Sequence, residues 1–504
     1  MVAIAYSVAF EGVEARLVEV QCSVAAGLPG FAIVGLPDKA VSEARERVRA
    51  AFGALAIAMP NRRLTVNLSP ADLPKEGSHF DLPIALAVLA ALDIIPADEL
   101  ARCVSLGELA LDGRLVQVTG ALPAAMAAAE DDRALICPRA CGPEAAWVET
   151  VPVIAPSTLR EVVDHLTDRH PLSRAQPGTI GGRAPVGCLS EVKGQERAKR
   201  ALEIAASGRH HLLMVGPPGA GKSMLAARLP GLMPPLSPVE ALETSMIHSL
   251  AGTLDEGGIS RHAPFREPHH TASMAAIVGG GRGAKPGEIS LAHNGVLFMD
   301  EFPEFPRQVL ETLRQPIETG EIVVARANAH IRYPCRFLLV AAANPCRCGH
   351  LADAAQACSR APNCGADYMG KISGPLMDRF DLRLEVPAVS FMDLELPPAG
   401  ETSERIALRV AAARDIQTRR FRDHPRLRAN ADASGAVLDE IASPCPEGRA
   451  LIVKASERLG LTARGYHRIL RTARTIADLD ASDTVRTPHL AEAISYRLPF
   501  VAGG

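Results

Sequence analysis

Residues 211–223 read HLLMVGPPGAGKS, a short apolar run that enters a glycine-rich loop just before helical sequence at residues 224–229. In this strand-to-helix context, successive backbone N–H groups turn toward phosphate, and the helix N-terminus adds a positive dipole end. The Lys of such a loop reaches the β- and γ-phosphates, and the Ser hydroxyl binds Mg²⁺. The stretch therefore predicts an ATP site in an α/β domain, with these nucleotide-binding residues: Gly216, Pro217, Pro218, Gly219, Ala220, Gly221, Lys222 and Ser223.

Two further apolar runs end in polar side chains that suit ATP chemistry. Residues 296–301 read VLFMDE, a strand that ends in two carboxylates. Because neighbouring strand residues point to opposite faces, we expect Asp300 to bind Mg²⁺ and Glu301 to activate the attacking water. Residues 337–343 form a third strand that ends at Asn344. Its amide can orient water against the γ-phosphate, although a plain Asn-Pro turn at a strand end would have the same sequence.

Length and composition limit the classes of protein to consider. The chain has 504 residues, of which 47% are hydrophobic and 22% are charged, so packed cores are expected and general disorder is excluded. A net charge of −3 gives no global basic field, and any nucleic-acid surface must be local. The longest apolar run, residues 82–92, is too short to cross a bilayer, and the chain starts without a basic leader. We therefore expect a cytoplasmic protein with no membrane partner.

Changes in pattern along the chain predict three domains. Residues 1–167 alternate β-type runs with helical stretches, which indicates an α+β domain, and residues 168–188 have the Pro and Gly content of a linker. Residues 189–395 hold the strand-like runs described above, separated by helical segments, which predicts a parallel sheet covered by helices. Residues 396–504 are helical in pattern and rich in Arg, typical of a small α-helical lid.

Longer motifs follow one another along almost the whole chain. They include PHHT at residues 268–271, PGEISLAHNGVLFMDE at 286–301, NPC at 344–346, DRFD at 378–381 and ARGYH at 463–467. In these motifs the chain resembles the YifB/ComM family of magnesium-chelatase-like AAA+ ATPases. The resemblance implies an AAA+ P-loop NTPase core with an α-helical lid, preceded by a Lon-protease-like α+β domain. It also adds Gln195, of the pair Gly194-Gln195, to the nucleotide-binding residues.

The same resemblance implies a ring of subunits. AAA+ proteins assemble head to tail, usually as hexamers, and ATP binds between subunits so that a neighbour's Arg reaches the γ-phosphate. By similarity to the MCM helicases, Arg379 is the expected arginine finger, and the alternative is an ordinary surface ion pair with Asp378 or Asp381. Arg464 matches the Arg that senses the nucleotide state. Arg468, one helical turn later, competes for that role.

Two segments are candidates for contact with DNA. Lys222 and Asp300 lie farther apart than one strand–helix crossover needs, so residues 249–290 contain an insertion, which in the family is the helix-two insert. Residues 321–332 form a second hairpin that resembles the pre-sensor hairpin of related motors. Both could be purely structural hairpins. As DNA-contacting elements they would reach the backbone through Arg266, His269, His270, Arg282, Lys285 and Arg326.

Four cysteines gather after Asn344 in the spacing C-x-C-x9-C-x5-C. Thiolates that converge in a short loop of a reducing compartment suggest a structural Zn²⁺ in tetrahedral coordination. The alternatives are fewer cysteine ligands with His350 as a substitute, or free thiols. The expected zinc ligands are Cys346, Cys348, Cys358 and Cys364.

The front domain lacks the groups of an active Lon-type protease. Alignment by resemblance places His79 at the position of the Ser nucleophile and Pro123 at the position of the Lys base. Ser78 together with Lys75 could still be invoked as a nucleophile and base. Similar degenerate domains of the RadA recombination ATPases favour a role in DNA binding and oligomer assembly.

These features together predict an ATP-dependent, ring-forming DNA motor that uses ATP, Mg²⁺ and a structural Zn²⁺. The family resemblance implies a branch-migration helicase that acts on recombination intermediates in DNA uptake and natural transformation. The second hypothesis is a magnesium-chelatase-type ATPase that remodels a protein partner, although the front domain and the cysteine loop argue against it. The third is a protein remodeller or an ATP-gated scaffold.

Overall fold

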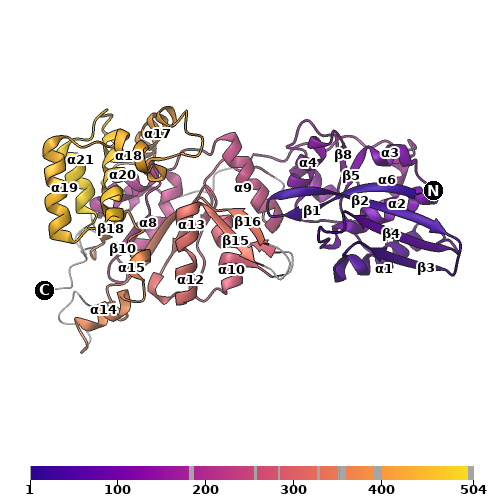
Figure 1. Cartoon of the computed structure of the whole chain (residues 1–504), viewed down its shortest axis with the longest axis horizontal. Coiled ribbons are helices and arrows are strands. Elements are labelled where there is room, and N and C mark those ends of the chain that lie inside the picture. The colour runs from indigo at the N-terminus through magenta and orange to yellow at the C-terminus, as the bar shows by residue number, and fades with distance from the viewer. Residues whose placement is uncertain are drawn as a thin grey trace.

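The computed structural model describes residues 2–180, 187–254, 258–281, 284–325, 330–349, 351, 359–389, 395 and 400–497. Three parts follow one another along the longest axis of the molecule (Figure 1). A front domain that contains the N-terminus lies at one end, a helical lid lies at the other, and a core domain joins them. Within the described residues, no helix combines the length and the apolar character that a membrane crossing needs.

The front domain is built on a seven-stranded sheet in the order β3-β4-β2-β1-β5-β8-β9. The long hairpin of β1 and β2 is antiparallel, and α2 is buried on all sides because residues 82–90 all face the core. The strands of this domain are β1 (Val2–Glu11), β2 (Glu14–Ala25), β3 (Gly30–Val34), β4 (Arg63–Ser69), β5 (Cys103–Ser105), β6 (Glu108–Leu109), β7 (Leu115–Val116), β8 (Ala134–Ile136) and β9 (Val153–Ile154). The helices are α1 (Lys39–Ala54), α2 (Asp81–Ala91), α3 (Ala97–Ala101), α4 (Ala121–Glu130), α5 (Gly142–Ala145) and α6 (Leu159–Leu166).

The segment predicted as a linker begins as part of the front domain. The Ala175 N–H donates to Val153 O at 2.8 Å, and Leu172 packs against the core of the domain. Residues 181–186 lie outside the described residues. The front domain therefore extends beyond the predicted boundary at residue 167.

The core domain is a parallel sheet in the order β11-β14-β17-β10-β18, which confirms the predicted α/β core covered by helices. Because all its strands run the same way, the loops after β10, β14 and β17 meet at one edge, where open α/β sheets bind ligands. The strands are β10 (Leu212–Val215), β11 (Phe265–Arg266), β14 (Val296–Met299), β17 (Leu338–Ala343) and β18 (Leu382–Glu385); smaller pairs are β12 (Gly279–Gly280) with β13 (Lys285–Pro286), and β15 (Glu321–Ala325) with β16 (His330–Pro334). The helices are α7 (Glu196–Gly208), α8 (Lys222–Arg228), α9 (Pro238–Ala251), α10 (Met274–Val278), α11 (Glu288–Leu291), α12 (Arg307–Thr312), α13 (Arg314–Thr319), α14 (Asn363–Met369) and α15 (Gly374–Met377).

The C-terminal region is helical, as its pattern predicts, and it shares one hydrophobic core with the core domain. On α20 the apolar side chains Ile469, Leu470 and Ile476 are buried in this shared core, and Thr462 caps the helix by accepting the Gly465 N–H at 3.1 Å. The lid is therefore fixed to the ATPase sheet by packing. Its helices are α17 (Ser403–Arg420), α18 (Gly435–Ile441), α19 (Pro446–Leu459), α20 (Ala463–Leu479) and α21 (Thr487–Ser495).

The front domain contacts the core domain at two places. The buried Glu144 carboxylate accepts a hydrogen bond from the Leu122 N–H at 3.0 Å and another from the Ser249 hydroxyl of α9. The turn of the β1–β2 hairpin lies so close to β16 that a Cβ on Gly12 would be 2.6 Å from Arg332 O. The front domain therefore touches both segments that the sequence predicts to contact DNA.

Candidate active site

The glycine-rich loop joins β10 to α8, and two of its glycines need a backbone shape that other residues rarely take. Gly219 and Gly221 have φ angles of +77° and +85°, in the left-handed region. A Cβ on either would meet no atom within 4 Å, so the loop is open on that side. The N–H groups of Gly216 and Ala220 donate to backbone carbonyls, and a phosphate would meet the remaining N–H groups of the loop on its open side.

Lys222 is buried in the first turn of α8 and connects the loop to the end of β17. Its Nζ donates to Gly216 O at 2.7 Å, to Pro217 O at 2.9 Å and to Asn344 Oδ1 at 3.1 Å. Burial lowers the pKa of the ammonium group, and the two carboxylates after β14 oppose that effect. The predicted phosphate ligand and the predicted water-orienting amide are thus in direct contact.

Ser223 and Asp300 face each other across the same edge of the sheet. The Ser223 hydroxyl donates to Asp300 Oδ2 at 2.7 Å, and Asp300 Oδ1 accepts the Glu301 N–H at 2.8 Å. Hydroxyl and carboxylate oxygens are the ligands that Mg²⁺ prefers in proteins. The donor set therefore fits the magnesium ion that the sequence predicts here.

Glu301 turns away from Asp300 and is paired with a histidine. Its φ is +50°, its side chain is 50% exposed, and its Oε2 lies 3.3 Å from His270 Nδ1. Because β11 pairs with β14, the residues that follow these two strands meet at the same edge. The structure therefore places His270 beside the predicted catalytic carboxylate, and its contact with DNA stays a prediction.

Gln195 joins the loop to the strand at the edge of the sheet. It has a left-handed backbone with φ of +59°, and its Nε2 donates to Pro387 O at 2.6 Å and to Ala220 O at 3.3 Å. The residue thus lies next to the phosphate loop, where the family resemblance places it. Its contact with nucleotide stays a prediction.

Arg379 lies before β18, toward the opposite end of the sheet. Its buried guanidinium donates to Pro375 O at 2.6 Å and forms an ion pair with Glu318. Within the described part of the chain, its ionic partner is Glu318 rather than Asp378 or Asp381. The structure therefore does not show the surface ion pair with Asp378 or Asp381 that was the alternative to an arginine finger.

The two candidate sensors on α20 have different surroundings. Arg468 donates to Asp381 Oδ1 at 2.6 Å, and although burial opposes it, the charge of Arg468 holds the pKa of this buried carboxyl well below its usual range. Arg464 is exposed and lines a cavity at the end of the sheet that carries Arg379. Arg468 thus has a structural partner, and Arg464 is the better candidate for contact with nucleotide.

Two of the residues predicted to contact DNA are engaged within the chain. The Arg266 guanidinium makes two hydrogen bonds of 2.6 Å to the Glu288 carboxylate, which neutralises its charge. His269 is exposed, and its Nδ1 lies 2.7 Å from the Thr271 hydroxyl. Arg266 is therefore a weaker candidate than its position in the sequence indicates.

The two predicted hairpins lie together. Lys285 is exposed on β13, and the loop before it packs against β16 because the Tyr333 hydroxyl donates to Ala284 O at 2.9 Å. Arg282 and Arg326 lie outside the described residues. Among the lysine and arginine residues predicted to contact DNA, Lys285 therefore has an exposed side chain that the structure describes.

The cysteine cluster is described only in part. Cys346 Sγ and Cys348 Sγ lie 3.1 Å apart, and Cys364 is in α14. Cys358 and His350 are outside the described residues, and no group of three or more candidate ligands gathers around one point among the residues that are described. The four-cysteine zinc site stays a prediction.

The groups considered for proteolysis in the front domain do not form a catalytic pair. Burial lowers the pKa of His79 to about 4, and its Nε2 lies 2.9 Å from a β1 carbonyl oxygen. The Ser78 hydroxyl donates to Glu108, whereas the buried Lys75 ammonium donates to a backbone carbonyl. Pro123 is buried within α4. That the domain is not a protease stays a prediction.

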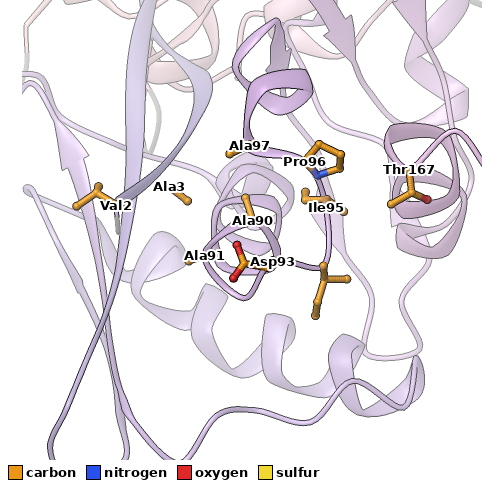
Figure 2. A pocket seen from close by; sticks show the side chains of 10 residues that line it. Val2, Ala3, Ala90, Ala91, Asp93, Ile95, Pro96, Ala97 and Thr167 are labelled. Atoms are coloured by element: carbon orange, nitrogen blue, oxygen red, sulfur yellow. The ribbon is translucent and has the colours of Figure 1, made fainter.

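A cavity of about 460 Å³ also lies in the front domain, between the end of α2 and the start of α3 (Figure 2). Apolar side chains such as Ile95 and Pro96 line most of it, and Asp93 is the charged residue among those that line it. It contains none of the residues that the sequence singles out. The residues that the sequence predicts for ATP chemistry lie instead at the edge of the core sheet.

Comparison with known proteins shows the family of the chain. Three family models match: "Magnesium chelatase, subunit ChlI" at residues 188–394, "Subunit ChlI of Mg-chelatase" at 18–141, and "Magnesium chelatase, subunit ChlI C-terminal" at 400–497. The competence protein ComM of Haemophilus influenzae is 44% identical over 98% of this chain and 97% of its own length. The uncharacterized protein YifB of Escherichia coli is 44% identical over 96% of this chain and 95% of its own. The magnesium-chelatase 38 kDa subunit of Rhodobacter capsulatus is 26% identical over 65% and 92%.

Proposed function

The chain belongs to the ComM/YifB family of magnesium-chelatase-like AAA+ ATPases, and from this premise we propose that it is an ATP-driven, ring-forming DNA motor that migrates branches in recombination intermediates. The observation that carries the proposal is the group of Lys222, Ser223, Asp300, Glu301 and Asn344 at one sheet edge. A relative over nearly the whole chain is named a competence protein, which supports a role in DNA uptake and natural transformation.

Each side chain at this edge has a distinct role in ATP hydrolysis. Lys222 neutralises the β- and γ-phosphates, and Asn344, in contact with Lys222, orients the attacking water. Glu301 accepts a proton from that water. When held by Ser223 and Asp300, Mg²⁺ supplies further neutralisation of the phosphate charge.

A second subunit completes the site in this proposal. Arg379 and Arg464 lie at the amino end of the sheet, whereas the phosphate loop lies at the carboxyl end, so they do not reach the ATP of their own subunit. Head-to-tail contact between subunits brings the two ends together and closes into a ring, for which we propose six members. Arg379 then stabilises the transition state of the neighbour's ATP, and Arg464 senses its nucleotide state.

The proposed DNA surface is the pair of hairpins β12–β13 and β15–β16. Lys285 is exposed there, and Arg282 and Arg326, which lie outside the described residues, have the charge to contact a phosphate backbone. The front domain touches α9 and β16, which supports a role in positioning these hairpins and in assembly. No aromatic side chain stands beside Arg326 in the sequence, which favours backbone contacts over base stacking.

The test is ATP-dependent branch migration of a synthetic four-way DNA junction by purified protein, with electron microscopy of the same sample. We expect rings, migration that needs ATP, and an ATPase rate that branched DNA raises and added salt lowers steeply. An ATPase that responds to no nucleic acid but to a tetrapyrrole-inserting partner would favour the chelatase hypothesis instead. The alignment with the chelatase subunit covers 65% of this chain, which leaves about a third of the chain outside it.

The contact of His270 with Glu301 predicts a restraint on hydrolysis. The contact with His270 occupies one oxygen of the Glu301 carboxylate, so His270→Ala should raise the ATPase rate without DNA roughly two- to fivefold, the effect of about 0.5–1 kcal/mol at an exposed pair. His269→Ala is the matched control, because His269 pairs with Thr271. A rate that falls in His270→Ala, or rises equally in both variants, would contradict the restraint.

We also propose that the cysteine loop binds a structural Zn²⁺ through Cys346, Cys348, Cys358 and Cys364. Tetrahedral Zn–S bonds place two thiolates roughly 3.8 Å apart, so the first two sulfurs, which lie 3.1 Å apart, would have to separate to share the ion. After expression in zinc-containing medium, elemental analysis should give about one zinc per chain. Cys348→Ser should lower this content and Cys445→Ser, outside the cluster, should not. A wild-type content well below one would remove the proposal.

A further inference from the structure

The arginines of the C-terminal region gather in one stretch that the ATP site does not use. Residues 419–428, the arginine segment, read RRFRDHPRLR and hold five arginines against one carboxylate. The segment starts at the end of α17, the uppermost labelled helix of the lid in Figure 1. In a chain with a net charge of −3, it is a local basic surface of the kind that contact with a polyanion requires.

Two of the five arginines are engaged within the chain. Arg420 donates two hydrogen bonds to the Asp478 carboxylate of α20, at 2.8 and 2.6 Å. Arg428 donates two hydrogen bonds of 3.1 Å to the Glu243 carboxylate of α9. Because two-pronged pairs of this kind fix the geometry of both partners, Arg420 and Arg428 hold the segment near both of its ends.

The other three arginines lie on the surface. Arg419, Arg422 and Arg426 are exposed, and none of the three is within ion-pair distance of a carboxylate in the part of the chain that the structure describes, Asp423 of the same segment included. Arg419 complements the dipole of α17 at its C-terminal end, but Arg422 and Arg426 lie beyond the helix. Three such charges within eight residues repel one another, so an anion that joins them lowers their energy.

The large apolar side chains of the segment are turned away from this surface. Phe421 is 4% exposed in the core that the lid shares with the ATPase sheet, and Leu427 packs against the same core. Between them, the His424 N–H donates to Phe421 O and the Leu427 N–H donates to His424 O, both at 2.8 Å. Protein partners dock on a surface with an apolar centre, which this segment does not present. Exposed guanidinium groups without a stacking aromatic suit a sugar–phosphate backbone instead.

The segment is tied to the helix that leads into the proposed DNA surface. Glu243, which holds Arg428, lies in α9, and α9 ends at Ala251, where the insertion with Lys285 begins. At a rise of 1.5 Å per residue, Glu243 and Ala251 are about 12 Å apart along the helix axis. The same helix packs against β13, which carries Lys285. One rigid element therefore connects the arginine segment with the first of the two hairpins.

We propose that Arg419, Arg422 and Arg426 form a further DNA contact, located on the lid, which binds the sugar–phosphate backbone without reading the base sequence. The inference rests on the proposed DNA motor and adds a lid surface to its two hairpins. Arginine suits this contact because its planar guanidinium can bind two oxygens of one phosphate. Each neutralised phosphate releases counterions, so the surface contributes a salt-dependent part of the DNA affinity.

The test is the affinity of the full chain for a labelled duplex and a labelled four-way junction, measured by fluorescence anisotropy over a range of salt concentrations. Arg419→Ala/Arg422→Ala should lower the affinity at least about tenfold near 0.1 M salt, and the slope of log affinity against log salt should become shallower by about 2. Arg419→Lys/Arg422→Lys should keep most of the affinity because it keeps the charge. Arg426 stays in place, because it also lines the cavity beside Arg464.

Arg449→Ala/Arg458→Ala is the matched control, because both are exposed arginines of the lid helix α19 and the change in net charge is the same. It should bind DNA like the wild type, and equal melting temperatures should show that all variants fold. Full retention of DNA binding by Arg419→Ala/Arg422→Ala would overturn the inference alone and would point to another anion, such as an acidic protein surface. An equal loss in the α19 control would reduce the effect to net charge and overturn it too. A wild type that binds no DNA would overturn the proposed motor and the inference together.

Discussion

Replacing Glu301 with Gln is expected to leave ATP bound and to lower the rate of ATP hydrolysis by at least about 10²-fold. The carboxylate follows β14, at the edge where Lys222 and Asn344 meet, and we propose that it takes a proton from the attacking water. An amide of the same size cannot accept that proton. The phosphate contacts come from Lys222 and Ser223, which the substitution does not alter, so binding and hydrolysis should separate.

Binding of a fluorescent ATP analogue and release of inorganic phosphate measure the two steps. Lys222→Ala is the opposite control: it removes a charge-assisted contact with phosphate, and ATP affinity should fall roughly 10- to 100-fold. Branch migration should stop in both variants. Equal turnover by wild type and Glu301→Gln would contradict the assignment of the base.

Much of this site can be predicted because each residue directly follows the strand that positions it. The phosphate loop, the two carboxylates and Asn344 each come after an apolar run, and β10, β14 and β17 are neighbours in the sheet. A parallel arrangement alone then brings the three strand ends together. The boundary of the front domain was less predictable, since Pro and Gly indicated a linker where Leu172 still packs on the domain core.

Contacts between distant segments could not be predicted from spacing. His270 reaches Glu301 because β11 pairs with β14, and hydrophobic periodicity does not specify which strands are neighbours. Arg379 pairs with Glu318 at the end of α13 rather than with the aspartates beside it in sequence. The cavity that Arg464 lines combines residues of the core domain and of the lid. It therefore forms only once the lid has packed onto α7.

Replacing Arg379 with Ala is expected to lower ATP hydrolysis in the assembled protein by about 10³-fold while each subunit still binds ATP. The guanidinium lies before β18, at the end of the sheet opposite to the phosphate loop of its own subunit. A catalytic contribution must therefore come from contact with a neighbour's γ-phosphate. The specific activity of the wild type should then rise with protein concentration as rings form.

The ion pair with Glu318 separates this role from a structural one. Glu318 is 46% exposed, but Arg379 is buried and also donates to Pro375 O, so Arg379→Ala should cost about 1–3 kcal/mol and lower the melting temperature by roughly 10 °C or less. Glu318→Gln keeps the guanidinium and should retain most of the hydrolysis. A purely structural Arg379 would instead lower the melting temperature strongly, and Glu301→Gln subunits would not restore the activity of Arg379→Ala subunits. Recovery in that mixture requires that the arginine act across the interface, because neither parent has both halves of a working site.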